Sequence, residues 1–309
     1  MSLPMISMFP ASLSSMVRET AKGKMEKRVL GKTGEKLSII GFGGIVVDKA
    51  TTEEAAARVK EAIDHGINYF DVAPSYGNAE EMLGPALEPY RKDVFLACKT
   101  GEREKEGSRR ELEQSLKYLR TDHFDLYQLH AVTTLDDVDT IFGKDGAMET
   151  FVEAREEGKV RFLGFSAHSV EAANALMDRF DFDSILFPFN YASWFAGDFG
   201  PQVLERAKKK EMGILALKSM AWRPWEEGEE RTVSKTWYKP HTNPEEANKG
   251  LRFTLSHPVT SAIPPGDENL FSMALKLAKD FKPMDGEEIK KMKEKGLQTN
   301  PLFSYPMET

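Results

Sequence analysis

The sequence has one cysteine, no long apolar run and no excess of basic residues. Cys98 is the single cysteine among 309 residues, which excludes an intramolecular disulfide and a cysteine-ligated zinc or iron–sulfur site. No apolar run reaches the roughly 18 to 20 residues of a membrane-spanning helix. The 49 acidic residues outnumber the 42 basic ones, which argues against nucleic-acid partners and polybasic membrane contacts. We therefore expect a cytoplasmic protein with no nucleic-acid or membrane partner.

The remaining composition is that of an ordinary globular protein, with 40% hydrophobic and 29% charged residues. A chain of 309 residues is long enough for one large α/β domain or two small ones. Residues 1–24 are rich in methionine and serine, contain Pro4 and Pro10, and lack the basic start of a signal peptide. We interpret residues 1–24 as an N-terminal arm or the remnant of a leader.

Apolar segments that fit buried strands alternate with segments of helical periodicity along the rest of the chain. A hairpin comes first, with arms at Glu26–Leu30 and Lys36–Ile40 around a glycine-containing turn. The strands predicted after the turn are residues 39–44, 67–71, 94–99, 124–130, 160–166, 185–189, 214–217 and 261–263. The predicted helices that follow them are residues 51–65, 80–87, 109–119, 147–157, 170–180, 201–210, 244–256 and 269–281.

Buried strands joined by helices run parallel, and eight such units close into a barrel within the usual ~250 residues. We therefore predict an α/β fold, a (β/α)8 TIM barrel with an N-terminal β-hairpin, in which residues 25–309 form a single domain with a C-terminal extension. An open doubly wound sheet would need G-x-G-x-x-G after the first strand. The run at residues 41–44 lacks the third glycine. Gly43 and Gly44 instead favour close approach of the backbone to a ligand, or a tight turn.

Polar residues follow three successive predicted strands, at the end where barrels place their active sites. Asp71 ends the second strand, and Tyr76 lies in the loop after it. Lys99 ends the third strand and His130 the fourth. Each has an ordinary explanation alone, because strand-end acids, loop tyrosines, solvent-reaching lysines and barrel-rim histidines are all common. Their coincidence at adjacent strands indicates that the side chains meet at one corner of the barrel mouth.

These four residue types suit proton transfer. The pKa of tyrosine is about 10 in solution, and two unit charges ~4 Å apart interact by roughly 4 kcal/mol at an effective dielectric of about 20. Lys99 is therefore expected to lower the pKa of Tyr76 by about a unit or more. Asp71 would keep the lysine charged, and His130 would donate to a substrate oxygen. The set offers no nucleophile–base pair and no metal-ligand cluster, and it fits protonation of a carbonyl oxygen while hydride arrives from a cofactor.

The region around Asp71 resembles the aldo-keto reductase superfamily, and the similarity extends over roughly residues 27–281. The matching runs are Phe-Asp-Val-Ala at 70–73, Ser-Tyr-Gly-Asn-Ala-Glu at 75–80 and Leu-Gly at 83–84. The resemblance implies a (β/α)8 barrel, a nicotinamide cofactor and a catalytic tetrad of Asp71, Tyr76, Lys99 and His130. In these roles Tyr76 is the general acid in reduction, Lys99 lowers its pKa, and His130 orients the carbonyl.

The resemblance also implies contacts with the cofactor, although this sequence departs from the family's pattern. Ser166 matches the serine of a Ser-Asn pair, whereas Leu186 stands where a glutamine is expected and Asn190 is the polar candidate nearby. Backbone capping would explain Ser166 and Asn190 equally well. The candidate cofactor-binding residues are Gly43, Gly44, Ser166, Asn190, Leu217, Lys218, Ile263, Gly266 and Asn269.

Asp267 and Glu268 lie where the family usually has Lys, Arg or Ser for the 2′-phosphate of NADP. NADP(H) is favoured at the family level, and NAD(H) is the alternative. The run Gly-Phe-Ser-Ala-His at residues 164–168 and the pair Lys218 and Met220 resemble a bacterial branch in which some members carry a C-terminal iron–sulfur module. With one cysteine, this chain is expected to lack that module.

A long insert at residues 219–243 follows the seventh strand and contains Trp222, Trp237 and Tyr238. Loops of this length are usually functional or disordered. We interpret the insert as a lid over the cofactor or the substrate mouth or, alternatively, as a solvated or subunit-contacting loop. Trp194 and Trp222 are the candidates for the substrate pocket, and simple packing is the alternative for Trp194.

The main functional prediction is an NAD(P)H-dependent oxidoreductase that reduces aldehydes or ketones, with a small-molecule carbonyl substrate and Tyr76 as the proton donor. One alternative is a non-catalytic nicotinamide-binding sensor or regulatory barrel, which the altered carboxamide contacts leave open although the intact tetrad favours catalysis. A further alternative is a barrel isomerase or aldolase that forms an imine on Lys99. The sequence leaves the substrate and the oligomeric state open.

Overall fold

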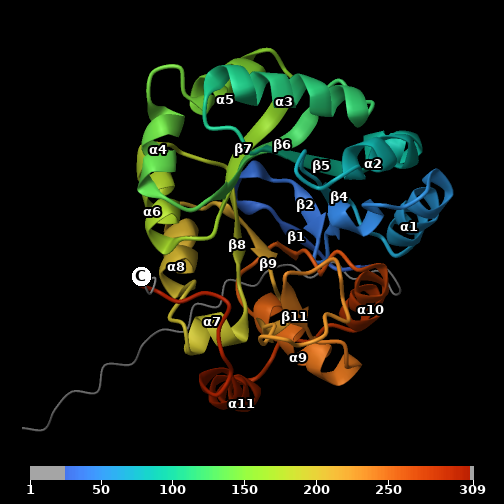
Figure 1. The fold of residues 1–309 in the computed structure, drawn as a ribbon, viewed down its shortest axis with the longest axis vertical. Helices are drawn as coiled ribbons and strands as arrows, with labels where there is room; N and C mark the ends of the chain where they lie inside the picture. Colours follow the sequence, from blue (N-terminus) through green and yellow to red (C-terminus); the bar gives the residue numbers. More distant parts are fainter. Residues whose placement is uncertain (1–24, 307–309) are drawn as a thin grey trace, which may run out of the picture.

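The computed structural model describes residues 25–306, so the proposed arm at residues 1–24 lies outside the described part of the chain. Eight parallel strands, paired in chain order, form its centre. They are β3 (Phe42–Gly43), β4 (Tyr69–Asp71), β5 (Phe95–Thr100), β6 (Phe124–Val132), β7 (Val160–Ala167), β8 (Ser184–Pro188), β9 (Gly213–Leu217) and β12 (Ser261–Ala262). The first and last strands are joined because Gly41 N donates to Ala262 O at 3.0 Å and Ala262 N donates to Ile39 O at 2.9 Å. The predicted (β/α)8 barrel is confirmed (Figure 1).

The predicted N-terminal hairpin is also confirmed, and it packs on the end of the barrel at which the strands begin. β1 (Lys27–Val29) pairs antiparallel with β2 (Lys36–Ser38). The turn between them starts at Gly31, where a Cβ would lie 2.2 Å from the backbone nitrogen of Gly213 at the start of β9. Leu30 and Leu37 join the apolar cluster inside the barrel. A ligand site is therefore expected at the opposite end, where the strands finish.

Helices cover the outside of the barrel. α1 (Thr52–Asp64) begins with a capping box, in which the side chains of Thr51 and Glu54 each accept a hydrogen bond from the other's backbone N–H. The other helices that follow barrel strands are α2 (Ala79–Leu87), α3 (Lys105–Tyr118), α5 (Ala147–Glu156), α6 (Val170–Arg179), α8 (Pro201–Lys209), α9 (Pro244–Leu255) and α10 (Glu268–Lys279). Their buried faces and the outward faces of the strands form one apolar layer.

The structure also contains elements that the sequence pattern does not predict. They are α4 (Leu135–Phe142), α7 (Tyr191–Phe195), α11 (Gly286–Leu297) and a hairpin of β10 (Ala221–Pro224) and β11 (Tyr238–Pro240). α4 and α7 are too short for periodicity to reveal them, although Thr134 and Asn190 cap them with their side chains. In the C-terminal extension α11 packs closely on α7, because a Cβ at Gly296 would lie 2.8 Å from Tyr191 O.

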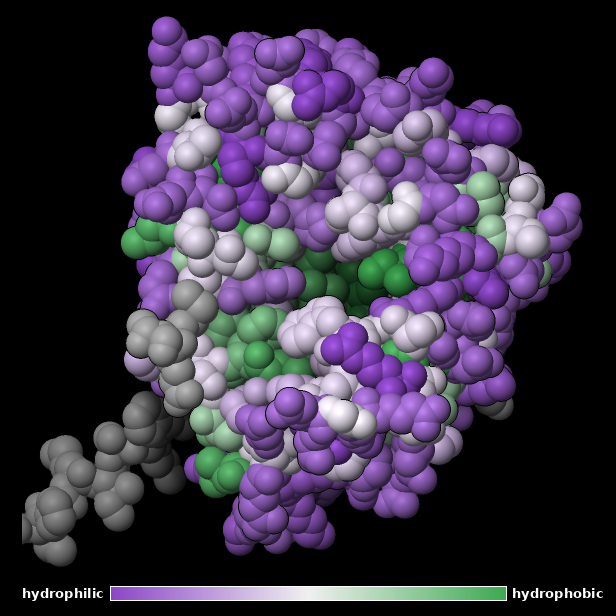
Figure 2. Space-filling model, in the orientation of Figure 1, coloured by the Kyte–Doolittle hydropathy of each residue, from purple (hydrophilic) through white to green (hydrophobic). Residues whose placement is uncertain are grey.

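Within residues 25–306 there is no helix with the length and apolar character needed to cross a membrane. The face of the molecule in Figure 2 is mainly hydrophilic, and hydrophobic residues gather in a hollow near its centre. A concave apolar surface within a polar one is the usual form of a small-molecule site.

Candidate active site

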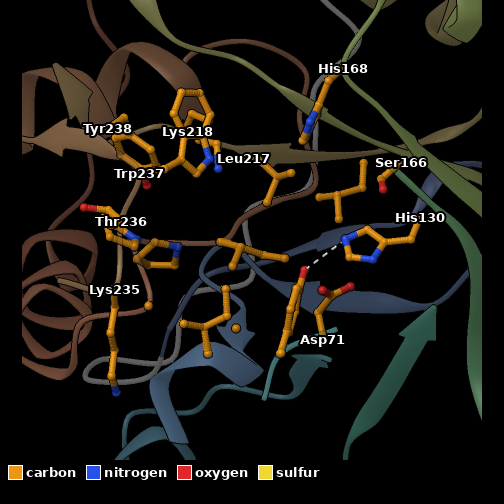
Figure 3. A pocket seen from close by; sticks show the side chains of 18 of the residues that line it. Asp71, His130, Ser166, His168, Leu217, Lys218, Lys235, Thr236, Trp237 and Tyr238 are labelled. Carbon is orange, nitrogen blue, oxygen red and sulfur yellow. Dashed lines mark hydrogen bonds between the residues drawn. The ribbon is translucent and has the colours of Figure 1, made fainter. Parts of the chain in front are cut away.

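The structure brings Asp71, Tyr76, Lys99 and His130 together at the carboxyl ends of the strands. Lys99 Nζ forms an ion pair with Asp71 and lies 3.3 Å from the Tyr76 hydroxyl. That hydroxyl is 3.5 Å from His130 Nε2 (Figure 3). Asp71, Lys99 and His130 lie on β4, β5 and β6, which pair side by side, and Tyr76 lies in the loop after β4. Neighbouring parallel strands therefore account for the convergence.

The buried carboxylate of Asp71 accepts hydrogen bonds from two buried side chains of the barrel as well as from Lys99. The Tyr69 hydroxyl donates to Asp71 Oδ2 at 3.0 Å, and Gln128 Nε2 donates to the same oxygen at 2.9 Å. Sequence reasoning missed these two residues. Each stands two positions before a site residue, Asp71 or His130, and strand alternation puts such pairs on the same face. That alternation was the signal that could have found them.

Burial and neighbouring charges act in opposite directions on Lys99 and Tyr76. Burial alone would lower the pKa of Lys99, but Asp71 and Tyr76 together outweigh it and the pKa is raised. Burial raises the pKa of Tyr76, and the Lys99 cation offsets only part of that rise. The net lowering expected for the Tyr76 pKa is therefore not found, because loss of contact with water outweighs the lysine. Lys99 stays charged, and the phenol stays protonated, which is the form that can donate a proton.

His130 is a neutral imidazole at neutral pH. Burial and then the positive charge of Lys99 lower its pKa to about 3. Ser75 Oγ lies 3.3 Å from His130 Nδ1, and Arg103 Nη2 donates to the His130 carbonyl oxygen at 2.9 Å. When Ser75 donates to Nδ1, the ring proton is on Nε2, the nitrogen that faces Tyr76. His130 can then donate to an oxygen that approaches the phenol.

The tetrad lines a cavity, and several residues expected to contact the cofactor line the same cavity. Those in its wall are Gly43, Ser166, Leu217, Lys218, Ile263 and Gly266. Ser166 Oγ accepts a hydrogen bond from Ala131 N at 2.7 Å, which fixes its position. Lining residues that were not among the predicted site residues are Ile45, His168, Leu186, Lys235, Thr236, Trp237, Tyr238, Pro264 and Pro265.

The other expected cofactor contacts lie outside the cavity wall. Gly44 packs on Val72, and a Cβ there would lie 2.6 Å from Val72 Cγ2. Asn190 is fully buried and caps α7 through its side-chain oxygen. Asn269 lies in the first turn of α10, where Asp267 caps the helix. Gly44 and Asn190 thus have roles within the fold, and the expected cofactor contact of Asn269 stays a prediction.

The two tryptophans expected in the substrate pocket pack on histidines outside the cavity. The centroids of Trp194 and His257 are 4.5 Å apart, and Trp222 stacks on His241 with centroids 5.7 Å apart. The aromatic residue of the insert with the greatest access to solvent is Trp237, which lines the cavity and is 51% exposed. No periodicity along the insert distinguishes these positions, because contacts with distant segments determine its path.

Ion pairs hold the insert at residues 219–243 in place, both within the insert and against another segment. Within it, Glu229 forms ion pairs with Arg223 and Lys239. At the cavity, Lys235 Nζ lies 3.4 Å from Glu268 Oε2 and donates to Val46 O at 3.2 Å, so that the insert reaches across to the loop after β3. Residues 235–238 form part of the cavity wall. The insert therefore contributes to the cavity wall, and its role as a lid stays a prediction.

The fold and the site together define a barrel protein with a buried lysine–carboxylate pair, a tyrosine and a histidine at one wall of a cavity. The model of the Aldo/keto reductase family matches residues 39–261. The chain therefore belongs to the aldo-keto reductase family.

Curated relatives match part of the chain. L-galactose dehydrogenase of Arabidopsis thaliana is 31% identical over 215 residues, which cover 64% of this chain and 66% of that protein. The uncharacterized oxidoreductase YqkF of Bacillus subtilis (strain 168) is 32% identical over 180 residues, which cover 54% of this chain and 56% of that protein. The matched stretch thus spans at most 66% of either relative.

Solved structures match nearly the whole chain. Aldo-keto reductase AKR11C1 of Bacillus halodurans, in its holo form, has a TM-score of 0.73 and 23% identity, and the match covers 91% of this chain and 98% of that one. An aldo-keto reductase of Klebsiella pneumoniae in complex with NADPH has a TM-score of 0.69 and 21% identity, covering 95% and 100%. At these identities the likeness concerns the fold.

Proposed function

We propose that the protein is an oxidoreductase that reduces the carbonyl group of an aldehyde or ketone with a nicotinamide nucleotide. The observation that carries this proposal is the Tyr76 hydroxyl, which lies at the cavity wall 3.3 Å from Lys99 Nζ and 3.5 Å from His130 Nε2. A proton donor beside a second hydrogen-bond donor is what protonation of a carbonyl oxygen requires. The names of the relatives, a dehydrogenase and an oxidoreductase, support the same class of reaction.

The chemistry of the cavity wall fits a nicotinamide nucleotide. Leu217 and Ile263 offer apolar surfaces for a ring, and Ser166 offers a hydroxyl group for a carboxamide. Gly266 provides backbone without a side chain, and Lys235 provides a positive charge for the phosphates. When it is bound, the nucleotide supplies the hydride.

The two acids after β12 disfavour the 2′-phosphate of NADP(H) less than the sequence alone suggests, because both carboxylates are engaged in other contacts. Asp267 Oδ1 accepts the backbone N–H of Asn269 at 3.0 Å and so caps α10. Glu268 lies 3.4 Å from Lys235 Nζ and 3.5 Å from Arg58 Nη2. Two cations from distant segments therefore offset this carboxylate. We favour NADP(H), which the Klebsiella pneumoniae neighbours hold as NADPH or NADP, and keep NAD(H) as the alternative.

The tetrad divides the work of protonation among its members. Tyr76 donates its proton to the carbonyl oxygen, and the Lys99 cation stabilises the phenolate that remains. Asp71 keeps Lys99 charged and in place. His130 donates from Nε2 to the same oxygen and orients the carbonyl group. Because Lys99 is protonated and ion-paired, it is a poor nucleophile, which disfavours an isomerase or aldolase that forms an imine on it.

Titration of the protein with NADPH and NADH, followed by a screen of aldehydes and ketones for nucleotide oxidation, tests the proposal. We expect one nucleotide to bind below about 1 mM and to be oxidised by at least one carbonyl compound. Binding without turnover of any compound would favour a nicotinamide-binding sensor. Failure of both nucleotides to bind at millimolar concentration would contradict the enzyme and the sensor alike.

A further inference from the structure

Lys218 is a cation in the cavity wall that has no anionic partner in residues 25–306. It directly follows β9, and its side chain makes no hydrogen bond or ion pair with the described residues. Its Nζ instead lies 4.7 Å from the ring centroid of Tyr238 and 5.3 Å from that of Trp237. Burial lowers the pKa of Lys218 to about 8. A partly buried ammonium group without a counter-charge is stabilised by an anion that enters the cavity.

His168 is a second polar group in the same wall without a hydrogen-bond partner. Its ring packs on Phe303 with centroids 5.5 Å apart, and neither ring nitrogen has a partner within the described chain. Burial and then the charge of Lys218 lower the pKa of His168 to about 4. The imidazole is therefore neutral and offers one N–H donor. Lys218 and His168 thus present one charged and one neutral donor in the same cavity wall.

The position of Lys218 places it at the reacting end of the cavity. Its positive charge contributes to the lowered pKa of His130, the residue proposed to orient the carbonyl. Figure 3 shows Lys218 beside Leu217 and on the same side as His168, whereas Lys235 lies at the far end from His130. Lys235 is at the end where Glu268 begins α10. Lys218 and Lys235 would therefore contact different parts of a ligand bound in the cavity.

The charges of the cavity wall leave Lys218 uncompensated. Asp71 is the one acidic residue among the described lining residues, and it is paired with Lys99. Lys235 is paired with Glu268. The rings of Tyr238 and Trp237 lie near Lys218 Nζ, and within residues 25–306 Lys218 forms no ion pair with a carboxylate. An anionic ligand is the partner that this arrangement lacks.

We infer that the substrate carries an anionic group, a carboxylate or a phosphate, in addition to the carbonyl that Tyr76 protonates, and that Lys218 and His168 bind this group. The inference rests on the proposed function and narrows its substrate class. It also assigns Lys218 to the substrate, whereas the family resemblance implies a contact with the cofactor. The neutral aldehydes and ketones of the same size are then poorer substrates.

Two matched pairs of substrates test the preference: 4-carboxybenzaldehyde against its methyl ester, and glyceraldehyde 3-phosphate against glyceraldehyde. We expect kcat/KM to favour the charged member of one pair by at least about tenfold, as for a hydrogen bond to a charged group. The pair that shows the preference distinguishes carboxylate from phosphate. In Lys218→Met the ratio should fall to about one, and Lys218→Arg should retain most of it. A ratio near one in the wild type for both pairs, or an unchanged ratio in Lys218→Met, would overturn the inference.

Binding of benzoate and inorganic phosphate separates this inference from the proposed function. Both anions are titrated into the NADP-loaded protein and followed by tryptophan fluorescence, because Trp237 adjoins Lys218. Lys218→Met should bind the preferred anion at least about tenfold more weakly, and Lys239→Met, whose lysine is paired with Glu229, should bind it as the wild type does. Lysine-dependent anion binding without turnover would mean that the proposed reaction fails while the anion site stands. Weaker nucleotide binding with unchanged anion affinity would assign Lys218 to the cofactor and overturn the inference.

Discussion

Lys99 and Asp71 form an ion pair that is almost completely removed from water, with side chains 0% and 2% exposed. The pair lies between the Tyr76 hydroxyl on the cavity side and the Tyr69 and Gln128 donors on the barrel side. A buried charge without its partner is strongly destabilising. The ion pair that keeps a cation next to the Tyr76 phenol is therefore also needed for the stability of this end of the barrel.

Loss of the Asp71 carboxylate should destabilise the fold as well as the reaction. We expect Asp71→Asn to lower the free energy of unfolding by about 3–5 kcal/mol, because Lys99 is left buried without its counter-charge. Asp122→Asn is the matched control, since Asp122 is 95% exposed and pairs with the surface residue His123. The control should stay within about 0.5 kcal/mol of the wild type. Equal stability of the two variants in urea unfolding would contradict a buried, charge-dependent pair.

Three histidines with strongly lowered pKa values should make the protein sensitive to mild acid. The pKa is about 3 for His130 and about 4 for His168 and His241, against about 6.5 in an unfolded chain. Because the folded-state values are lowered, the unfolded chain binds protons first, and stability is lost as the pH falls below about 6.5. Each histidine should contribute about 1.4 kcal/mol per pH unit between about 6.5 and its folded pKa.

Urea unfolding between pH 7.5 and pH 5 measures this effect before most carboxylates titrate. The free energy of unfolding should be nearly level above about pH 7 and should fall steeply below about pH 6. His241→Gln should reduce the slope by about one proton. A wild-type protein equally stable at both ends of this range would show that the histidines are not held neutral in the fold.

The convergence of the tetrad could be predicted because it depends on chain order alone. Asp71, Lys99 and His130 end strands that are consecutive in the sequence, and consecutive parallel strands lie side by side in a barrel. The net effect on the Tyr76 pKa could not be predicted in the same way. It depends on how far the phenol is removed from water, which is a property of the packed structure.

The contacts of the insert at residues 219–243 also could not be predicted from the sequence. Lys235 contacts Glu268 and the carbonyl of Val46, partners that are far away in the sequence. Such contacts follow no period, so the sequence offered Trp222 for the pocket where the structure places Trp237 in the cavity wall. For the same reason the sequence could not show that Glu268 forms ion pairs with Lys235 and Arg58.

Lys235 should contribute to nucleotide binding through its charge. We expect Lys235→Met to weaken NADPH binding by about tenfold, as for the loss of a charged hydrogen bond, because Lys235 is the lining cation at the end away from His130. Lys239→Met is the control, since Lys239 belongs to the same insert and is also ion-paired, with Glu229, but does not line the cavity. Fluorescence titration with NADPH and NADH measures both variants. A loss confined to NADPH would place Lys235 at the 2′-phosphate, whereas wild-type affinity for both nucleotides would remove it from the cofactor site.

The role of Tyr76 as proton donor is tested most directly by the rate of a single turnover. Tyr76→Phe keeps a ring against Lys99 Nζ, which lies 5.0 Å from the ring centroid in the native site, but removes the hydroxyl. NADPH oxidation by 4-carboxybenzaldehyde is followed in the wild type and the variant, and the dissociation constant for NADPH is measured for both. We predict that the chemical step slows by at least about 10²-fold, while NADPH affinity stays within about twofold. A variant that oxidises NADPH at the wild-type rate would contradict the account.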